Sequence, residues 1–182
     1  MNESVFEYFP VLETRRLILG EIKEEHAQRI FEMRRDGRVN EHIARPPIKD
    51  ENTALEIVKK CKELFDNKGG IAWAGIDKEN GQFIGSCGFN RIEKWNNRAE
   101  IGGELMVEYW GKRISFEAVK EIIHFGLNQL KLDAIEAKVI STNKSAIFVL
   151  EKLGFEKEAH FKKFIPAQDK PLDLCVYVLH KA

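Results

Sequence analysis

The sequence has few cysteines, no long hydrophobic run and no excess of either charge. Its three cysteines, Cys61, Cys87 and Cys175, lie far apart and are odd in number, so neither a disulfide framework nor a cysteine-rich metal site is expected. The longest clean apolar run, residues 71–76, is far too short to span a bilayer, and the first residues lack the layout of an export signal. We therefore expect a protein of the reducing cytoplasm with no membrane partner.

The charge balance argues against a nucleic-acid partner. The chain has 29 basic and 29 acidic residues, with a net charge of +0 at pH 7, whereas nucleic-acid binding normally requires a basic excess. The five histidines are not spaced as metal ligands, so we expect no metal. With 182 residues, 43% of them hydrophobic, the chain suits a single domain over residues 1–182 with a packed core.

Hydrophobic periodicity predicts strands and helices in a mixed order. Strands are expected at 15–22, 70–77, 82–92, 98–107, 133–140, 155–165 and 172–179, and helices at 23–36, 53–67, 115–130 and 142–155. Asn80-Gly81 and residues 166–170 are turn signals. Asp50 or Asn52 is the candidate N-cap of the second predicted helix, and Asn143 is that of the last. The strand–helix–strand unit over 98–140 should make its two strands parallel, with antiparallel strands on both sides. The fold class is therefore α/β (α+β-like), with a mixed, mostly antiparallel sheet and helices on both faces.

The stretch "MVEYWGKRISFEAV", residues 106–119, has a glycine and two cationic residues between the end of a predicted strand and the start of a predicted helix. A helix N-terminus exposes unpaired N–H groups and a partial positive charge, which can bind an anion. The helix dipole contributes only about 0.3–1 kcal/mol, so a phosphate would need several amides and a cation together. On these residues alone, an ordinary solvated helix start is the slightly better interpretation. A Walker loop and an opening GxGxxG are both missing, which disfavours those types of nucleotide site.

Three motifs taken together reverse that preference. "AEIGGELMVEYWGKRISFEAV" and "TNKSAIFVLEKLGF" occur in the order and separation that resemble the GNAT superfamily of acetyl-CoA-dependent N-acetyltransferases. "LETRRLILGEI" resembles the branch that modifies the N-terminal alanine or serine of ribosomal proteins. The resemblance extends from about Val11 to Leu179. It implies a GNAT-type sheet with a central splayed parallel strand pair, and acetyl-CoA (coenzyme A) as the acyl donor.

The resemblance also implies roles for individual residues. Glu104 is the implied base, with Glu100 as second choice, and the amide of Met106 is an implied donor to the thioester carbonyl oxygen. Ser145 is the candidate proton donor, although helix capping is its simpler role. The cofactor-binding residues that the resemblance implies lie on the splayed strand, at the helix start and at the start of the next helix: Leu105, Met106, Val107, Gly111, Lys112, Arg113, Ile114, Ser115 and Asn143.

Five positions depart from the family pattern, one of them Ser115, where the family commonly has alanine. Arg113 stands where the loop usually has a second glycine, and arginine tolerates a left-handed backbone poorly. The loop therefore either avoids that conformation or binds phosphate more weakly. Ala146 and Leu150 replace a serine and a tyrosine of some relatives, which leaves the general acid open. Gly103 replaces a common aromatic residue, which predicts a wider acceptor pocket.

We expect an N-acetyltransferase that moves the acetyl group directly to a primary amine, either a protein N-terminal α-amine or a small-molecule amine. The alternative is a non-catalytic acyl-CoA-binding regulatory module with a degenerate site. The run "EMRRDGR" at residues 32–38 is most simply a solvated helix end, but in a GNAT-like fold it would border the acceptor site. An acidic or peptide acceptor would suit it. The sequence leaves a monomer and a homodimer equally open.

Overall fold

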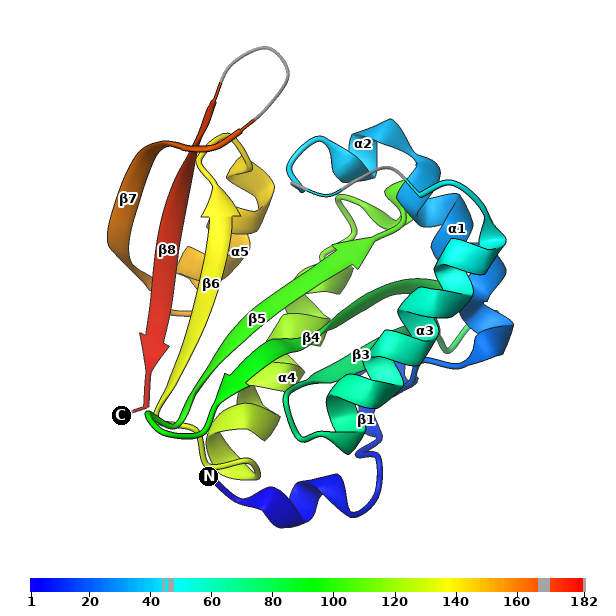
Figure 1. The fold of residues 1–182 in the computed structure, drawn as a ribbon, viewed down its shortest axis with the longest axis horizontal. Coiled ribbons are helices and arrows are strands. Elements are labelled where there is room, and N and C mark those ends of the chain that lie inside the picture. The colour runs from blue at the N-terminus through cyan, green and yellow to red at the C-terminus, as the bar shows by residue number, and fades with distance from the viewer. Residues whose placement is uncertain (44, 46–47, 167–170, 182) are drawn as a thin grey trace.

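Eight strands form the sheet in a computed structural model that describes residues 1–43, 45, 48–166 and 171–181. Their order is β1-β2-β3-β4-β5-β6-β8-β7, and helices cover both faces (Figure 1). The strands are β1 (Leu12–Glu13), β2 (Leu17–Glu21), β3 (Ile71–Asp77), β4 (Phe83–Glu93), β5 (Arg98–Leu105), β6 (Ala134–Ile140), β7 (Glu156–Ile165) and β8 (Leu172–His180). The α-helices are α1 (Ala27–Arg35), α2 (Gly37–Asn40), α3 (Glu51–Asp66), α4 (Ile114–Asn128) and α5 (Lys144–Lys152).

The predicted mixed sheet is confirmed, and its one parallel pair among the described strands is β5 and β6. These two strands pair over only three positions, from Arg98↔Ala134 to Glu100↔Glu136. β5 continues along β4, and β6 continues along β8, so the two strands diverge beyond Glu100 and Glu136 (Figure 1). We call residues 101–105 of β5 and 137–140 of β6 the splayed segment. The splay expected from the family resemblance is therefore present.

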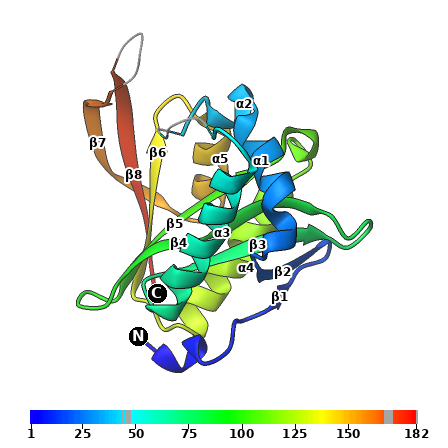
Figure 2. The ribbon, with the colours of Figure 1, turned by 45° about the vertical axis from the view of Figure 1, so that its right-hand side comes forward.

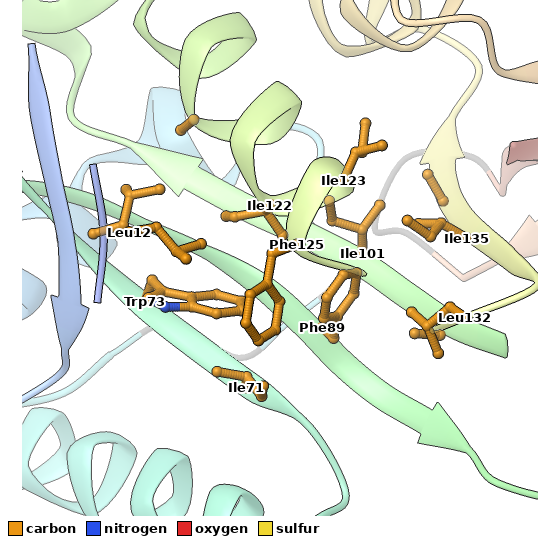
Figure 3. Close-up of a cluster of buried hydrophobic side chains, with 14 of the residues drawn as sticks. Leu12, Ile71, Trp73, Phe89, Ile101, Ile122, Ile123, Phe125, Leu132 and Ile135 are labelled. Atoms are coloured by element: carbon orange, nitrogen blue, oxygen red, sulfur yellow. The ribbon is translucent and has the colours of Figure 1, made fainter. Parts of the chain in front are cut away.

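Helix α4 lies on one face of the sheet, and α1 and α3 lie on the other (Figure 2). On the apolar face of α4, Ile122 and Phe125 pack against Trp73 of β3 and Phe89 of β4 (Figure 3). The rings of Trp73 and Phe125 are 5.3 Å apart and nearly perpendicular, a favourable arrangement for two aromatic side chains. The indole N–H of Trp73 donates to the carbonyl of Pro10 at 2.7 Å, so this buried donor is satisfied.

Some element ends agree with the prediction, and others do not. Asp50 caps α3 by accepting from the amide of Thr53 at 2.8 Å, as its sequence position predicted. β5 ends at Leu105 rather than at residue 107, because the buried Met106 packs toward α1 and α3 and the chain then forms a 3₁₀ turn, η3 (Val107–Tyr109). The short helix α2 was not predicted; it begins inside "EMRRDGR". Residues 167–170 of the predicted last turn lie outside the described residues.

Two negative findings concern the described residues alone. None of their helices combines the length and the apolar character that crossing a membrane requires. Among the same residues, no three potential metal-ligating side chains converge on one point.

Candidate active site

The N-terminus of α4 carries no side-chain cap among the described residues. Its N-cap residue, Arg113, makes no capping hydrogen bond, whereas Asp50 caps α3 and Asn143 caps α5. The first amides of α4, those of Ile114 and Ser115, are therefore left as unpaired donors. Arg113 is left-handed and Ile114 is helical, and this succession turns consecutive N–H groups toward one point. Such a concavity suits an anion.

The backbone of this loop is left-handed at two positions. Gly111 has φ of 73°, and Arg113 has φ of 59° and ψ of 20°. The first of the two predicted alternatives, that the loop avoids the left-handed conformation at Arg113, is therefore wrong. For a residue with a Cβ, that conformation costs about 1–2 kcal/mol. Some contact of the surrounding structure must offset this cost.

The amides of β5 alternate in direction, and this alternation identifies which of them face the splayed segment. The amide of Met106 donates to the carbonyl of Ile84 on β4 at 2.9 Å, so the predicted donor role of the Met106 amide is wrong. Because neighbouring residues of a strand point their amides to opposite sides, the amides of Leu105 and Gly103 face away from β4. The donor nearest the end of the splayed segment is therefore Leu105.

The residues that follow Leu105 make their own backbone contacts. The carbonyl of Met106 accepts from the amide of Tyr109 at 3.0 Å, and the carbonyl of Val107 accepts from the amide of Trp110 at 3.0 Å. The indole N–H of Trp110 donates to the carbonyl of Leu105 at 2.8 Å. These bonds fold η3 back against the end of β5. They direct the chain into the Gly111–Arg113 loop.

Glu104 is the most enclosed acidic side chain at this end of β5, with only 5% of its side chain exposed. Its Oε1 accepts from Arg34 Nε of α1 at 2.7 Å, and its Oε2 accepts from Arg45 Nη1. Asn40 Oδ1 accepts from Arg45 Nε at 2.9 Å, which fixes the second guanidinium. Arg45 Nη2 is buried and has no partner among the described residues. The cluster thus combines one carboxylate with two guanidiniums.

Neither arginine of this cluster is a predicted site residue, although a GNAT-like fold is expected to place residues 32–38 beside the acceptor site. Their simplest interpretation, a solvated helix end, is wrong for Arg34, because its side chain is only 23% exposed. The signal was the helical spacing, because Arg34 follows the buried Ile30 and Ala27 on the inward face of α1. Arg45 had no such signal, since it lies in a loop whose path depends on the rest of the fold.

Glu100, the second candidate base, lies where β5 and β6 are still paired. Its Oε2 accepts from Lys138 Nζ of β6 at 2.7 Å, and this hydrogen bond is the main cause of the raised pKa of Lys138. Glu136 also contacts the same ammonium at 3.2 Å. Glu100 therefore belongs to an ion-pair group at the closed end of the strand pair rather than to the splayed segment.

The start of α5 contains the next group of predicted residues. Asn143 Oδ1 accepts from the amide of Ala146 at 3.1 Å, so its predicted capping role is confirmed. Ser145 lies exposed in the first turn, and Leu150 is buried in the core at 7% exposure. Leu150 therefore cannot supply the proton that a tyrosine supplies in some relatives. His42 Nδ1, after α2, lies 3.4 Å from Thr142 Oγ1, which brings the α2 and α5 sides of the site together.

Gly103 has a packing explanation rather than the predicted one. A Cβ at this position would lie 2.9 Å from both Cys87 Sγ and the carbonyl oxygen of Ser86, closer than real Cβ atoms approach. By strand alternation Gly103 also faces the same side as Ile101, toward α4, and not the side of Glu104. The close approach of β4 therefore requires the glycine, and the prediction that it widens the acceptor pocket is not supported.

Comparison with known proteins agrees with this geometry. The acetyltransferase (GNAT) domain family matches residues 16–156. The chain is 33% identical over 170 residues to the uncharacterized N-acetyltransferase p20 of Bacillus licheniformis, covering 93% of this chain and 96% of that protein. It is 30% identical over 173 residues to the uncharacterized N-acetyltransferase YoaA of Bacillus subtilis, covering 95% and 98%. It is 25% identical over 162 residues to the [ribosomal protein uS5]-alanine N-acetyltransferase of Escherichia coli, covering 85% and 82%.

Solved structures share the fold. A ribosomal L7/L12 alpha-N-protein acetyltransferase, RimL, in complex with coenzyme A superposes with a TM-score of 0.87 at 15% identity, covering 94% of this chain and 98% of that one. The microcin C7 self-immunity acetyltransferase MccE, in complex with acetyl-CoA and AMP, superposes with a TM-score of 0.83 at 18% identity, covering 92% and 93%. The family match extends over most of the chain, through the splayed strands and the α4 loop. The chain therefore belongs to the GNAT family and is an acetyl-CoA-dependent N-acetyltransferase.

Proposed function

We propose that this protein transfers the acetyl group of acetyl-CoA directly to a primary amine, either a protein N-terminal α-amine or a small-molecule amine. The observation that carries the proposal is the uncapped N-terminus of α4 beside the splayed segment. This arrangement places an anion-binding concavity beside a strand whose Gly103 and Leu105 amides have no partner strand among the described residues. Acetyl-CoA has a diphosphate that suits the concavity and a long amide-containing arm that suits the strand.

The residues present fit this donor. The amides of the Gly111–Ser115 loop would hold the diphosphate, and the side chains of Lys112 and Arg113 add positive charge beside it. The Leu105 amide would pair with the pantetheine arm or donate to the thioester oxygen. Asn143 uses its oxygen as a helix cap, so its side-chain NH₂ group would be available to the same arm. When bound, acetyl-CoA supplies an activated acyl carbon and a thiolate leaving group.

The proton transfers are assigned to Glu104 and Ser145. The acceptor must lose a proton to become nucleophilic, and both Glu104 oxygens already accept from guanidiniums. Glu104 would therefore take the ammonium proton through a water molecule that bonds to a remaining lone pair of the carboxylate, rather than by direct contact. Ser145 would donate to the departing sulfur from the first turn of α5. A positioned acid or base typically contributes about 10²–10⁴ in rate.

The acceptor side of the site is positively charged. Arg34 and Arg45 outnumber the Glu104 carboxylate, and Arg45 Nη2 lacks a partner among the described residues. A buried guanidinium nitrogen without a partner is costly, so an anionic group on the acceptor would be stabilised there. This supports an acceptor with a carboxylate near its amine, such as an acidic peptide N-terminus. The similarity to a ribosomal-protein-alanine acetyltransferase supports a protein N-terminus.

Calorimetry with coenzyme A, combined with thiol release from acetyl-CoA over a panel of amines and peptides, tests the proposal. Amine-dependent thiol release supports direct transfer, and the acceptors that cause it identify the acceptor class. Binding without release over the panel would overturn the proposed acceptors, and no binding would overturn the proposed donor site. Ser115→Pro removes one first-turn amide at a position where proline is tolerated, and it should weaken binding about tenfold. Ser115→Ala keeps the amide and should bind normally.

A further inference from the structure

The side chain of Arg16, in the turn between β1 and β2, connects three parts of the molecule. Its Nε donates to Glu117 Oε2 at 2.9 Å, while its own backbone amide donates to Glu117 Oε1 at 2.7 Å. Its Nη1 donates to the carbonyl oxygen of Lys112 at 2.8 Å. Arg16 thus joins the first turn of α4 to the loop that precedes α4. The arginine comes from the motif "LETRRLILGEI", whose role the reaction itself leaves unexplained.

The contact with Lys112 determines the direction of the next amide. The peptide bond is trans and planar, so the carbonyl of Lys112 and the N–H of Arg113 point to opposite sides. With the guanidinium of Arg16 on the carbonyl side, the N–H of Arg113 points the other way. That amide then joins those of Ile114 and Ser115 in the concavity at the head of α4.

The same contact explains how an arginine is tolerated at position 113. The left-handed conformation of Arg113 is unfavourable for a residue with a Cβ, and a rotated Lys112–Arg113 peptide would relieve it. Rotation would break the hydrogen bond from Arg16 Nη1, which is stronger than a neutral hydrogen bond because its donor is charged. The two effects oppose each other. The bond can therefore hold the peptide against its own backbone preference.

Glu117 gives Arg16 a fixed position. Its side chain is only 19% exposed, and it accepts from both the backbone and the side chain of Arg16. A planar guanidinium held at Nε can direct Nη1 to one place, which a flexible ammonium cannot do. Arg15, the neighbouring residue, is exposed and provides a natural contrast.

We propose that Arg16 is a positioning residue for the acyl donor, which holds the Lys112–Arg113 peptide so that the loop amides face the diphosphate. The proposal rests on the proposed binding of acetyl-CoA by the head of α4. Arg16 acts through the loop and has no contact of its own with the reacting atoms.

The first test compares Arg16→Ala with Arg15→Ala. Arg16→Ala should weaken coenzyme A binding about tenfold in calorimetry and raise the KM for acetyl-CoA by a similar factor, with kcat at saturation nearly unchanged. The kcat/KM with acetylated pantetheine, which lacks the diphosphate, should stay at the wild-type value. Arg16→Lys should not restore affinity, and Arg15→Ala should bind normally. Equal losses with both donors, or equal losses in both variants, would overturn the proposal.

The second test removes the strain that Arg16 opposes. Glycine adopts the left-handed conformation freely, so Arg16→Ala should weaken binding by less than about threefold when combined with Arg113→Gly. The same tenfold loss in that background would contradict a role through Arg113.

A third measurement needs no ligand. Hydrogen exchange of the amides of residues 112–115 should be faster in Arg16→Ala than in Arg15→Ala, with both variants shown to be folded by thermal unfolding. If the wild type fails to bind coenzyme A, the proposed function fails, yet this exchange experiment still decides whether Arg16 holds the loop. Should Arg16→Ala not fold, Arg16→Lys provides the same comparison. Unchanged exchange would overturn the proposal.

Discussion

Arginine and glutamate side chains form ion pairs in two places near the splayed segment, and the two places differ in burial and in the groups that the arginines contact. On the proposed donor side, Glu117 is 19% exposed and accepts from one arginine, Arg16, which also donates to a backbone carbonyl. On the proposed acceptor side, Glu104 is 5% exposed and lies between two arginines, which come from α1 and from the loop after α2. The first arrangement fixes a main-chain conformation. The second concentrates positive charge in a partly buried cluster.

The difference indicates how each side would recognise its ligand. The proposed donor side uses amides that are close together in sequence, so a loop motif describes nearly all of it. The proposed acceptor side uses side chains of residues 34, 45 and 104, which only the fold brings together. The residues of the proposed donor side can therefore be recognised in one motif, and those of the proposed acceptor side cannot.

The largest expected effect is that of Glu104→Ala on stability. Removing the carboxylate leaves two partly buried guanidiniums without a counter-ion, and breaking a buried pair typically costs about 3–5 kcal/mol. Urea denaturation measures the loss in the free energy of unfolding. Glu100→Ala, on the same strand, breaks a more exposed contact with Lys138 and should cost less than about 1 kcal/mol. Equal costs for the two variants would remove the contrast between the two glutamates.

Glu104→Gln addresses chemistry rather than stability. The amide keeps the shape of the side chain but accepts fewer hydrogen bonds and cannot take a proton. Turnover should fall by a factor of about 10²–10⁴ while the affinity for coenzyme A stays unchanged. Steady-state rates over a range of pH, together with calorimetry, provide the measurement. Full activity over the whole range would exclude Glu104 from the reaction.

Arg45→Ala sharpens the comparison on the acceptor side. The variant should lower kcat/KM by about 10–100-fold for amines with a neighbouring carboxylate, the size of one charge-assisted hydrogen bond. Matched neutral amines should lose much less. The assay compares each acidic acceptor with its amide, at constant acetyl-CoA. The same loss for both acceptors would mean that Arg45 serves only to hold Glu104.

A smaller effect is expected from the titration of Glu117. Desolvation of its carboxyl raises the pKa, but the hydrogen bonds from Thr14 and Arg16 and the charge of Arg16 outweigh it and lower the pKa from the ordinary 4.5. A carboxyl with a lowered pKa stabilises the fold fully above pH 4.5 and loses this contribution as the pH falls through the folded-state value. Urea denaturation below pH 4.5 should therefore show a shallower pH dependence for Glu117→Gln than for the wild type.

The smallest expected effect is at Cys87. Burial raises the pKa of its thiol to about 12, so the reactive thiolate is scarce at neutral pH. Alkylating reagents should leave Cys87 unmodified in the folded protein and modify it after unfolding in urea, as mass spectrometry of the peptides would show. Rapid labelling of the folded protein would mean that the β4 and β5 contact at Gly103 opens readily.

Local patterns were enough to predict the elements on which the proposed donor site rests. The stripe of α4, the caps at Asp50 and Asn143, and the parallel strands around α4 all follow from spacing within one element or one strand–helix–strand unit. The direction of the Met106 amide was missed, because a one-residue shift in strand phase reverses which side an amide faces. The role of Arg45 could not be predicted, since a loop side chain finds its partner only once the sheet and helices are assembled.

The short ladder between β5 and β6 has a mechanical consequence. Only three residue pairs join the half of the sheet that ends in β5 to the half that begins with β6. Beyond these pairs, the angle between the two halves depends on how α4 and α5 pack against them. If the proposed acceptor binds between these strands, core side chains that it does not touch set the space it has, and Ile123→Val is expected to alter the choice of substrate.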